Sequence, residues 1–232
     1  MKVLFNADDF GLTKGVTDGI IEAHVNGVVG STTLMMNGKA TDYAVAQAKA
    51  HPLLKVGIHL VLTWGRPISK NVPGLVDTGG CFKYKNSYRE MEAPDAYEVK
   101  KEWRAQIEAF LATGLPLHHI DSHHHIHGWE PLKKIVVLLA REYNVPVRYV
   151  ESLKDEADIL LTEKLWLDFY SDGVDGKVFE KLHKVDADTI EVMTHPAHVD
   201  DDLRESSSYL EKREEELRIL CAVDLPDWAT LL

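Results

Sequence analysis

Short apolar runs alternate with amphipathic segments along most of the chain. The first run, residues 3–5, ends in polar residues, and the apolar positions of the next segment, 15–26, share roughly one helical face. The same strand-then-helix order recurs downstream and indicates parallel βαβ units. Strands are expected over 3–5, 28–36, 56–62, 117–125, 145–150, 159–161 and 189–194, and helices over 15–26, 40–50, 96–113, 131–143, 162–170, 175–183 and 203–220.

This pattern predicts one α/β domain over residues 1–232 with about seven βα-like units, a length that suits an α/β barrel. A Rossmann-type sheet is disfavoured because no GxGxxG follows the first strand, and no Walker loop occurs. Residues 64–94 interrupt the alternation with prolines, glycines and scattered aromatic residues. A loop of this length is either a lid or binding loop, or a variable surface insertion.

Composition narrows the function classes. Asp and Glu number 37 against 26 Lys and Arg, a formal net charge of -11, so nucleic acid and anionic membranes are poor candidate partners. Two distant cysteines form no disulfide framework, and neither a signal peptide nor a membrane-spanning stretch is apparent. We therefore expect a cytoplasmic protein. The unusual number is 12 histidines, six of them within residues 118–127.

Acidic and histidine side chains fall at the ends of four predicted strands. Asp8 and Asp9 follow the first strand, and His59 lies in the third. His123 lies near the end of the fourth strand and His195 follows the last. Because an α/β barrel gathers the carboxyl ends of its strands on one face, these side chains are expected to converge there.

One aspartate and two histidines make a three-point site for a divalent metal with open positions for water and substrate. Neighbouring aspartates on an extended chain point to opposite sides, so one could bind the metal while the other deprotonates a water. Two imidazoles suit Zn²⁺ or another transition ion, whereas Mg²⁺ prefers oxygen ligands.

Each of these residues also has a structural interpretation. Asp8 and Asp9 could form a turn or a helix cap, and His59 could be a core histidine. The histidine cluster could be a surface tract, and His195 could simply bond a backbone carbonyl. In a strand, His123 and His125 would share a face, so a second metal or a site built from alternate histidines remains open.

Several strings resemble the YdjC-like carbohydrate deacetylases, a family that includes a chitooligosaccharide deacetylase. They are NADDFGL at 6–12, GIHL at 57–60, HIDSHHHIH at 119–127 and EVMTHPA at 191–197, in order through nearly the whole chain. Residues 151–184 match poorly. The resemblance implies a distorted (β/α) TIM-like barrel that uses one divalent metal to remove N-acetyl groups from small chitin-type saccharides. It also suggests magnesium and a homodimer.

The resemblance implies a role for individual residues as well. It assigns Asp9, His59 and His123 as metal ligands, Asp8 as general base and His195 as the general acid that protonates the leaving amine. By analogy with the wider polysaccharide deacetylases, Arg148 would orient Asp8.

Candidate substrate contacts are less sharply defined. Trp64 could stack on a sugar face or pack under its loop, and Arg66 could bind an anionic group such as a sugar phosphate. His125 is a further candidate contact, although it, His124 and His127 could also support the site or pack. Two alternatives to a deacetylase remain: a two-metal phosphoesterase or amidohydrolase that uses the clustered histidines, and an inert carbohydrate-binding protein.

Overall fold

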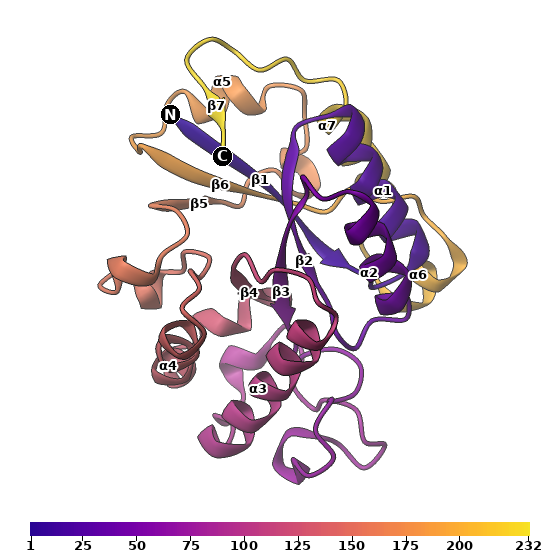
Figure 1. Ribbon diagram of the computed structural model, residues 1–232, viewed down its shortest axis with the longest axis vertical. Helices are drawn as coiled ribbons and strands as arrows, with labels where there is room; N and C mark the ends of the chain where they lie inside the picture. The colour runs from indigo at the N-terminus through magenta and orange to yellow at the C-terminus, as the bar shows by residue number, and fades with distance from the viewer.

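A parallel β-sheet lies at the centre of the protein (Figure 1). The computed structural model describes residues 1–232. The strands are β1 (Lys2–Phe10), β2 (Val29–Leu34), β3 (Lys55–Leu60), β4 (Ile120–Ser122), β5 (Lys164–Trp166), β6 (Thr189–Thr194) and β7 (Thr230–Leu231). Their order is β4–β3–β2–β1–β6–β5, and the short β7 pairs with the start of β1.

Both edges of this sheet are joined by one segment of chain. Beyond β4, Val147 forms parallel bridges with Ile120 on one side and Leu160 on the other. From Leu160 the chain runs into β5, which pairs with β6 at the opposite edge. The sheet therefore curls into a distorted barrel, as predicted. Because its strands are parallel, their carboxyl ends lie together at one end of the barrel.

The helices are α1 (Lys14–Asn26), α2 (Thr41–Ala50), α3 (Ala96–Ala112), α4 (Lys133–Tyr143), α5 (Val178–Leu182), α6 (Asp201–Ser206) and α7 (Glu211–Leu220). In Figure 1, α1, α2, α6 and α7 lie on one side of the sheet, and α3 and α4 lie near β3 and β4. The Thr13 side chain caps α1 by accepting from the Val16 N–H. No helix is both long enough and apolar enough to span a bilayer.

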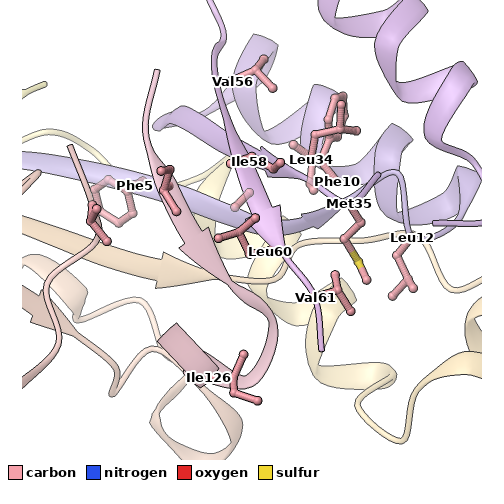
Figure 2. Packing of buried hydrophobic residues seen from close by; sticks show 14 of the residues in the cluster. Phe5, Phe10, Leu12, Leu34, Met35, Val56, Ile58, Leu60, Val61 and Ile126 are labelled. Carbon is pink, nitrogen blue, oxygen red and sulfur yellow. The ribbon is translucent and has the colours of Figure 1, made fainter. Parts of the chain in front are cut away.

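The core is a single cluster of 54 buried hydrophobic residues between the sheet and its helices. Figure 2 shows part of it, including Phe5 and Phe10 from β1, Leu34 from β2 and Ile58 from β3. Eight of the nine residues of β1 are buried. Its carboxyl end therefore places Asp8 and Asp9 in a largely water-free setting, where unpaired charge is costly.

The structure corrects the predicted end of the fourth strand. Strand β4 stops at Ser122, and His123–Gly128 form a 3₁₀ turn instead. His124 and His125 have consecutive φ angles of +56° and +54°, which lie in the left-handed region and turn the chain away from an extended strand. The premise that His123 and His125 share a strand face was therefore wrong.

Other predicted boundaries also change. Strand β1 continues to Phe10, and residues 145–150 contribute only the bridges of Val147. The helix predicted over 162–170 is absent and β5 occupies part of that segment, while the helix predicted over 203–220 is split into α6 and α7. Between β3 and α3, which includes the irregular segment 64–94, the chain forms no named strand or α-helix. It has 3₁₀ turns at Pro73–Leu75 and Tyr88–Glu90 and one antiparallel bridge between Val76 and Phe82.

Candidate active site

A pocket of about 450 Å³ opens at the carboxyl ends of the central strands. The predicted residues Asp8, Asp9, His59, His123 and His195 all line it, although they come from four separate parts of the chain. The expected convergence of strand ends is therefore present. The other lining residues are Leu12, Trp64, Asn86, His124, His125, Leu167, Tyr170, Met193, Ser206, Ser207, Ser208, Tyr209 and Arg213.

Asp9, His59 and His123 form a compact group. Oδ1 of Asp9 lies 2.9 Å from Nδ1 of His123 and 3.3 Å from Nε2 of His59. One ligand atom from each residue lies within 4.8 Å of the others. Asp9 reaches this position with a φ of +69°, a backbone conformation that aspartate tolerates better than most residues. The donor atoms are thus of the types, and at the spacing, that could hold one divalent metal ion.

A buried carboxylate fixes the orientation of His59. Oδ1 of Asp121 lies 2.7 Å from Nδ1 of His59, and Thr33 donates a hydrogen bond to the other Asp121 oxygen at 2.9 Å. Nε2 of His59 is thereby directed toward Asp9. Burial alone would lower the pKa of His59, but Asp121 and the other carboxylates raise it to about 10. The site therefore has a strong preference for a positive charge among its carboxylates.

Asp8 bonds Arg148, although a carboxylate oxygen of Asp8 also lies within 4.8 Å of a ring nitrogen of His59. The Arg148 guanidinium donates two hydrogen bonds to it, from Nη1 to Oδ2 at 2.6 Å and from Nη2 to Oδ1 at 2.5 Å. Burial would raise the pKa of Asp8, but the Arg148 charge and hydrogen bonds hold that pKa well below its usual range. Asp8 is therefore ionised at neutral pH.

Arg148 is itself fully buried and touches two further carboxylates. Its Nη2 lies 3.0 Å from Oδ2 of Asp121, and its Nε donates to Oε1 of Glu191 at 2.8 Å. Burial raises the pKa of Glu191 to about 7. One guanidinium thus connects Asp8 with the carboxylate that orients His59.

A second buried arginine comes from helix α7. Nη2 of Arg213 donates to Oδ2 of Asp9 at 2.7 Å, and its Nε donates to the backbone oxygen of Tyr209 at 3.0 Å. This leaves Oδ1 of Asp9 facing the two histidines. Arg213 therefore restricts Asp9 to presenting one oxygen to the pocket.

His195 follows the last residue of β6 and lines the same pocket. Its ring contacts Tyr170 and Tyr209 edge-on, with ring centroids 5.6 and 5.9 Å apart. Its backbone N–H donates to Glu216, whose pKa burial raises to about 8. Burial also lowers the pKa of His195 to about 4, so the imidazole is neutral near pH 7.

The predicted substrate contacts divide into two groups. Trp64 and His125 line the pocket, and burial lowers the pKa of His125 to about 3. Arg66 is exposed and is not among the lining residues. His127 instead bonds Ser122 beneath the turn, and none of the possible metal-binding groups contains His125 or His127.

Asp121, Glu191 and Arg213 were given no role in the sequence interpretation. Asp121 and Glu191 could have been found from the sequence, because each is a carboxylate within a predicted apolar strand and a buried charge needs a partner. Arg213 could not have been found in this way, because the surrounding residues 211–218 are mostly charged and are typical of a solvated helix.

Comparison with known sequences covers the whole chain. A family model described as YdjC-like protein matches residues 2–230. A protein from Oceanobacillus iheyensis named carbohydrate deacetylase is 59% identical over 228 residues, which are 98% of this chain and 99% of that protein. A protein of the same name from Brevibacillus brevis is 45% identical and covers 98% of this chain and 94% of its own length.

Two solved structures share the fold. One, from Enterococcus faecalis, is described provisionally as a cellobiose-phosphate cleavage protein. It has a TM-score of 0.88 and 34% sequence identity, over 95% of this chain and 90% of that one. The lactam utilization protein from Thermus thermophilus has a TM-score of 0.55 at 18% identity over 95% of both chains, a likeness of fold alone.

Proposed function

Since the chain belongs to the YdjC-like protein family, we propose that it is a carbohydrate deacetylase that hydrolyses the N-acetyl groups of small oligosaccharides with the help of one divalent metal ion. The observation that carries the proposal is the pairing of two carboxylates with different partners in one pocket. Asp9 faces two imidazoles, and Asp8 is held by Arg148. Metal-assisted amide hydrolysis needs both arrangements, a metal site and a base beside it.

Asp9, His59 and His123 would hold the metal. The fit rests on the directed donor atoms and on Asp121, because metal-binding histidines typically bond a carboxylate through their other ring nitrogen. Two imidazoles with one carboxylate favour Zn²⁺ or another transition ion over Mg²⁺. The chemistry that such an ion supplies is polarisation of the acetyl carbonyl and a lower pKa for the attacking water.

Asp8 would act as the general base. Its two hydrogen bonds with Arg148 keep it ionised and fix its plane, so that it can accept a proton from the water as the water attacks the carbonyl carbon. A base with a low pKa is weak in bulk water. A bound metal would lower the pKa of the attacking water and so reduce the mismatch between base and water.

His195 would protonate the leaving amine. The imidazole is neutral near pH 7, so it must first take up a proton from solvent, and the proton that Asp8 accepts from the water returns to solvent after acetate leaves. Negative charge that develops on the acetyl oxygen raises the pKa of a nearby imidazole and favours this uptake. The amine then leaves as the carbon–nitrogen bond breaks, and acetate remains. His195 and Asp8 line the same pocket, as the two roles require.

The substrate would be a chitin-type oligosaccharide of N-acetylglucosamine. A pocket of about 450 Å³ is of the size that accepts a small ligand. Trp64 and His125 would contact the sugar, and Arg66, outside the lining of the pocket, would meet a phosphate on phosphorylated substrates.

An acetate-release assay tests this function. The metal-stripped protein is offered N-acetylated chitobiose and its 6-phosphate, with Zn²⁺, Mg²⁺ and other divalent ions added back singly. We expect release that depends on added metal. Failure to release acetate from any acetylated sugar, with hydrolysis of phosphate esters instead, would favour the phosphoesterase alternative.

A further inference from the structure

We propose that a groove beside the catalytic pocket, lined by Trp166, Leu167, Tyr170, Asp172 and Lys184, binds a further sugar unit of the substrate chain. The proposal rests on the proposed deacetylase function and extends it. It predicts that the enzyme acts best on oligosaccharides long enough to reach this groove.

The groove adjoins the catalytic pocket. The groove has a volume of about 740 Å³ and shares Leu167 and Tyr170 with the pocket that contains Asp8 and His195. Leu167 is 45% exposed and Tyr170 42% exposed, so two large apolar side chains stand in solvent at the boundary between the two hollows. A chain that leaves the pocket on this side would pass directly over them.

The segment that carries these side chains is fixed in place. Phe169 between them is fully buried in the core, and the N–H of Ser171 donates to the Tyr209 hydroxyl at 3.0 Å. A Cβ on Gly173 would collide with the Asp168 carbonyl oxygen, so the loop closes tightly on itself and only glycine fits. A preformed surface loses little entropy when a ligand binds.

The chemistry of the groove suits a sugar. Trp166, Leu167 and Tyr170 offer apolar surface to the carbon–hydrogen face of a pyranose ring, while exposed Asp172 and Lys184 offer hydrogen bonds to its hydroxyl groups. Ligand sites typically combine a mostly apolar lining with a few polar groups in this way. Tyr209 connects this surface to the catalytic pocket, because it stacks on Tyr170 with ring centroids 4.3 Å apart.

The test compares substrate lengths. kcat/KM for acetate release is measured on N-acetylglucosamine oligomers of two, three and four units, for the wild type and for Trp166→Ala and Lys184→Ala. We expect the wild type to prefer a longer oligomer over the dimer by about tenfold, which corresponds to about 1.4 kcal/mol. The two variants should reduce this preference to nearly one. Tyr97→Ala, an exposed aromatic residue on α3 outside both hollows, should retain it.

Two results would overturn the subsite: a wild type without length preference, or variants that keep the full preference. Circular dichroism and metal content establish that Trp166→Ala is folded, and the exposed Lys184 gives a second variant that does not depend on packing. Calorimetric binding of the same oligomers repeats the comparison without turnover. Length-dependent binding that the variants abolish, without acetate release, would contradict the deacetylase function and leave the subsite standing.

Discussion

Arg148 holds Asp8 through two parallel hydrogen bonds, while the same guanidinium contacts Asp121, which orients His59. The candidate base and a candidate metal ligand are therefore connected through one buried cation. Asp8, proposed as the general base, and Asp9, proposed as a metal ligand, therefore have different partners. Substitutions that affect the base and substitutions that affect the metal site should have different effects on turnover and metal binding.

Asp8→Asn should reduce turnover by about 10²–10⁴-fold, the usual contribution of a general base. Metal content should stay near the wild-type level, because the three proposed ligands Asp9, His59 and His123 are unchanged and Asp8 bonds Arg148. Acetate release and metal analysis on the same sample check both statements. Asp42→Asn, an exposed aspartate on α2, is the matched control. Near-normal turnover in Asp8→Asn would remove Asp8 from the mechanism.

Asp121→Asn should weaken metal affinity by about 10–100-fold, as loss of a carboxylate behind a metal-binding histidine usually does. The defect should be recovered by excess metal, because His59 itself is still present. His59→Ala removes a ligand and should not recover over the same metal range. Competition with a chelator measures both affinities. Equal metal affinity in His59→Ala and the wild type would contradict the assignment of His59.

Arg148→Met should lower the free energy of unfolding by about 3–5 kcal/mol at pH 7, because it leaves buried carboxylates without their cation. Arg141→Met is the matched control. Arg141 is 53% exposed and pairs with Glu156 and Asp158 at the surface, so its loss should cost at most about 1 kcal/mol. Urea unfolding monitored by circular dichroism gives both values. Equal losses in the two variants would mean that the buried network adds no more than a surface pair.

Glu216→Gln should change how stability depends on pH. Burial raises the pKa of Glu216 to about 8, above its unfolded value near 4.5, so the folded state retains a proton that the unfolded state has lost. The wild type therefore loses stability from this group as pH rises between these values. His195, with a pKa lowered to about 4, works in the opposite sense below about 6.5, its unfolded value.

The difference between the two proteins from pH 6.5 to 8 isolates the Glu216 effect, because Glu191 and His59, whose pKa values are also raised, are present in both. Across this range, metal-free Glu216→Gln should gain about 1–2 kcal/mol relative to the wild type, since each pH unit contributes up to about 1.4 kcal/mol per proton. Urea titrations at several pH values measure the difference. Parallel pH profiles for the two proteins would show that Glu216 is ionised in the folded state.

The sequence predicted the α/β barrel because its strands carry dense apolar runs that periodicity detects. It failed where local backbone geometry overrides the pattern. Residues 123–125 continue an apparent strand, yet positive φ angles at His124 and His125 turn the chain away. Strand β7 is too short for any periodic signal, whereas the strand predicted over 145–150 keeps only the bridges of Val147.

For the site, the residues at strand ends could be predicted because the barrel determines where those ends meet. The supporting groups could not. Arg213 reaches Asp9 from 204 positions away, and Glu216 meets the backbone of His195 from the same helix. Such contacts depend on how α7 packs against the strand ends. This packing cannot be predicted from the local pattern of apolar and polar residues.

Metal titration of acetate release tests the central claim most directly. Metal-free protein is given N-acetylated chitobiose, and acetate is followed as Zn²⁺ is added in steps. The account predicts negligible release without metal and a rise that saturates at one ion per chain. Full release from metal-free protein, or none at any metal loading, would contradict it.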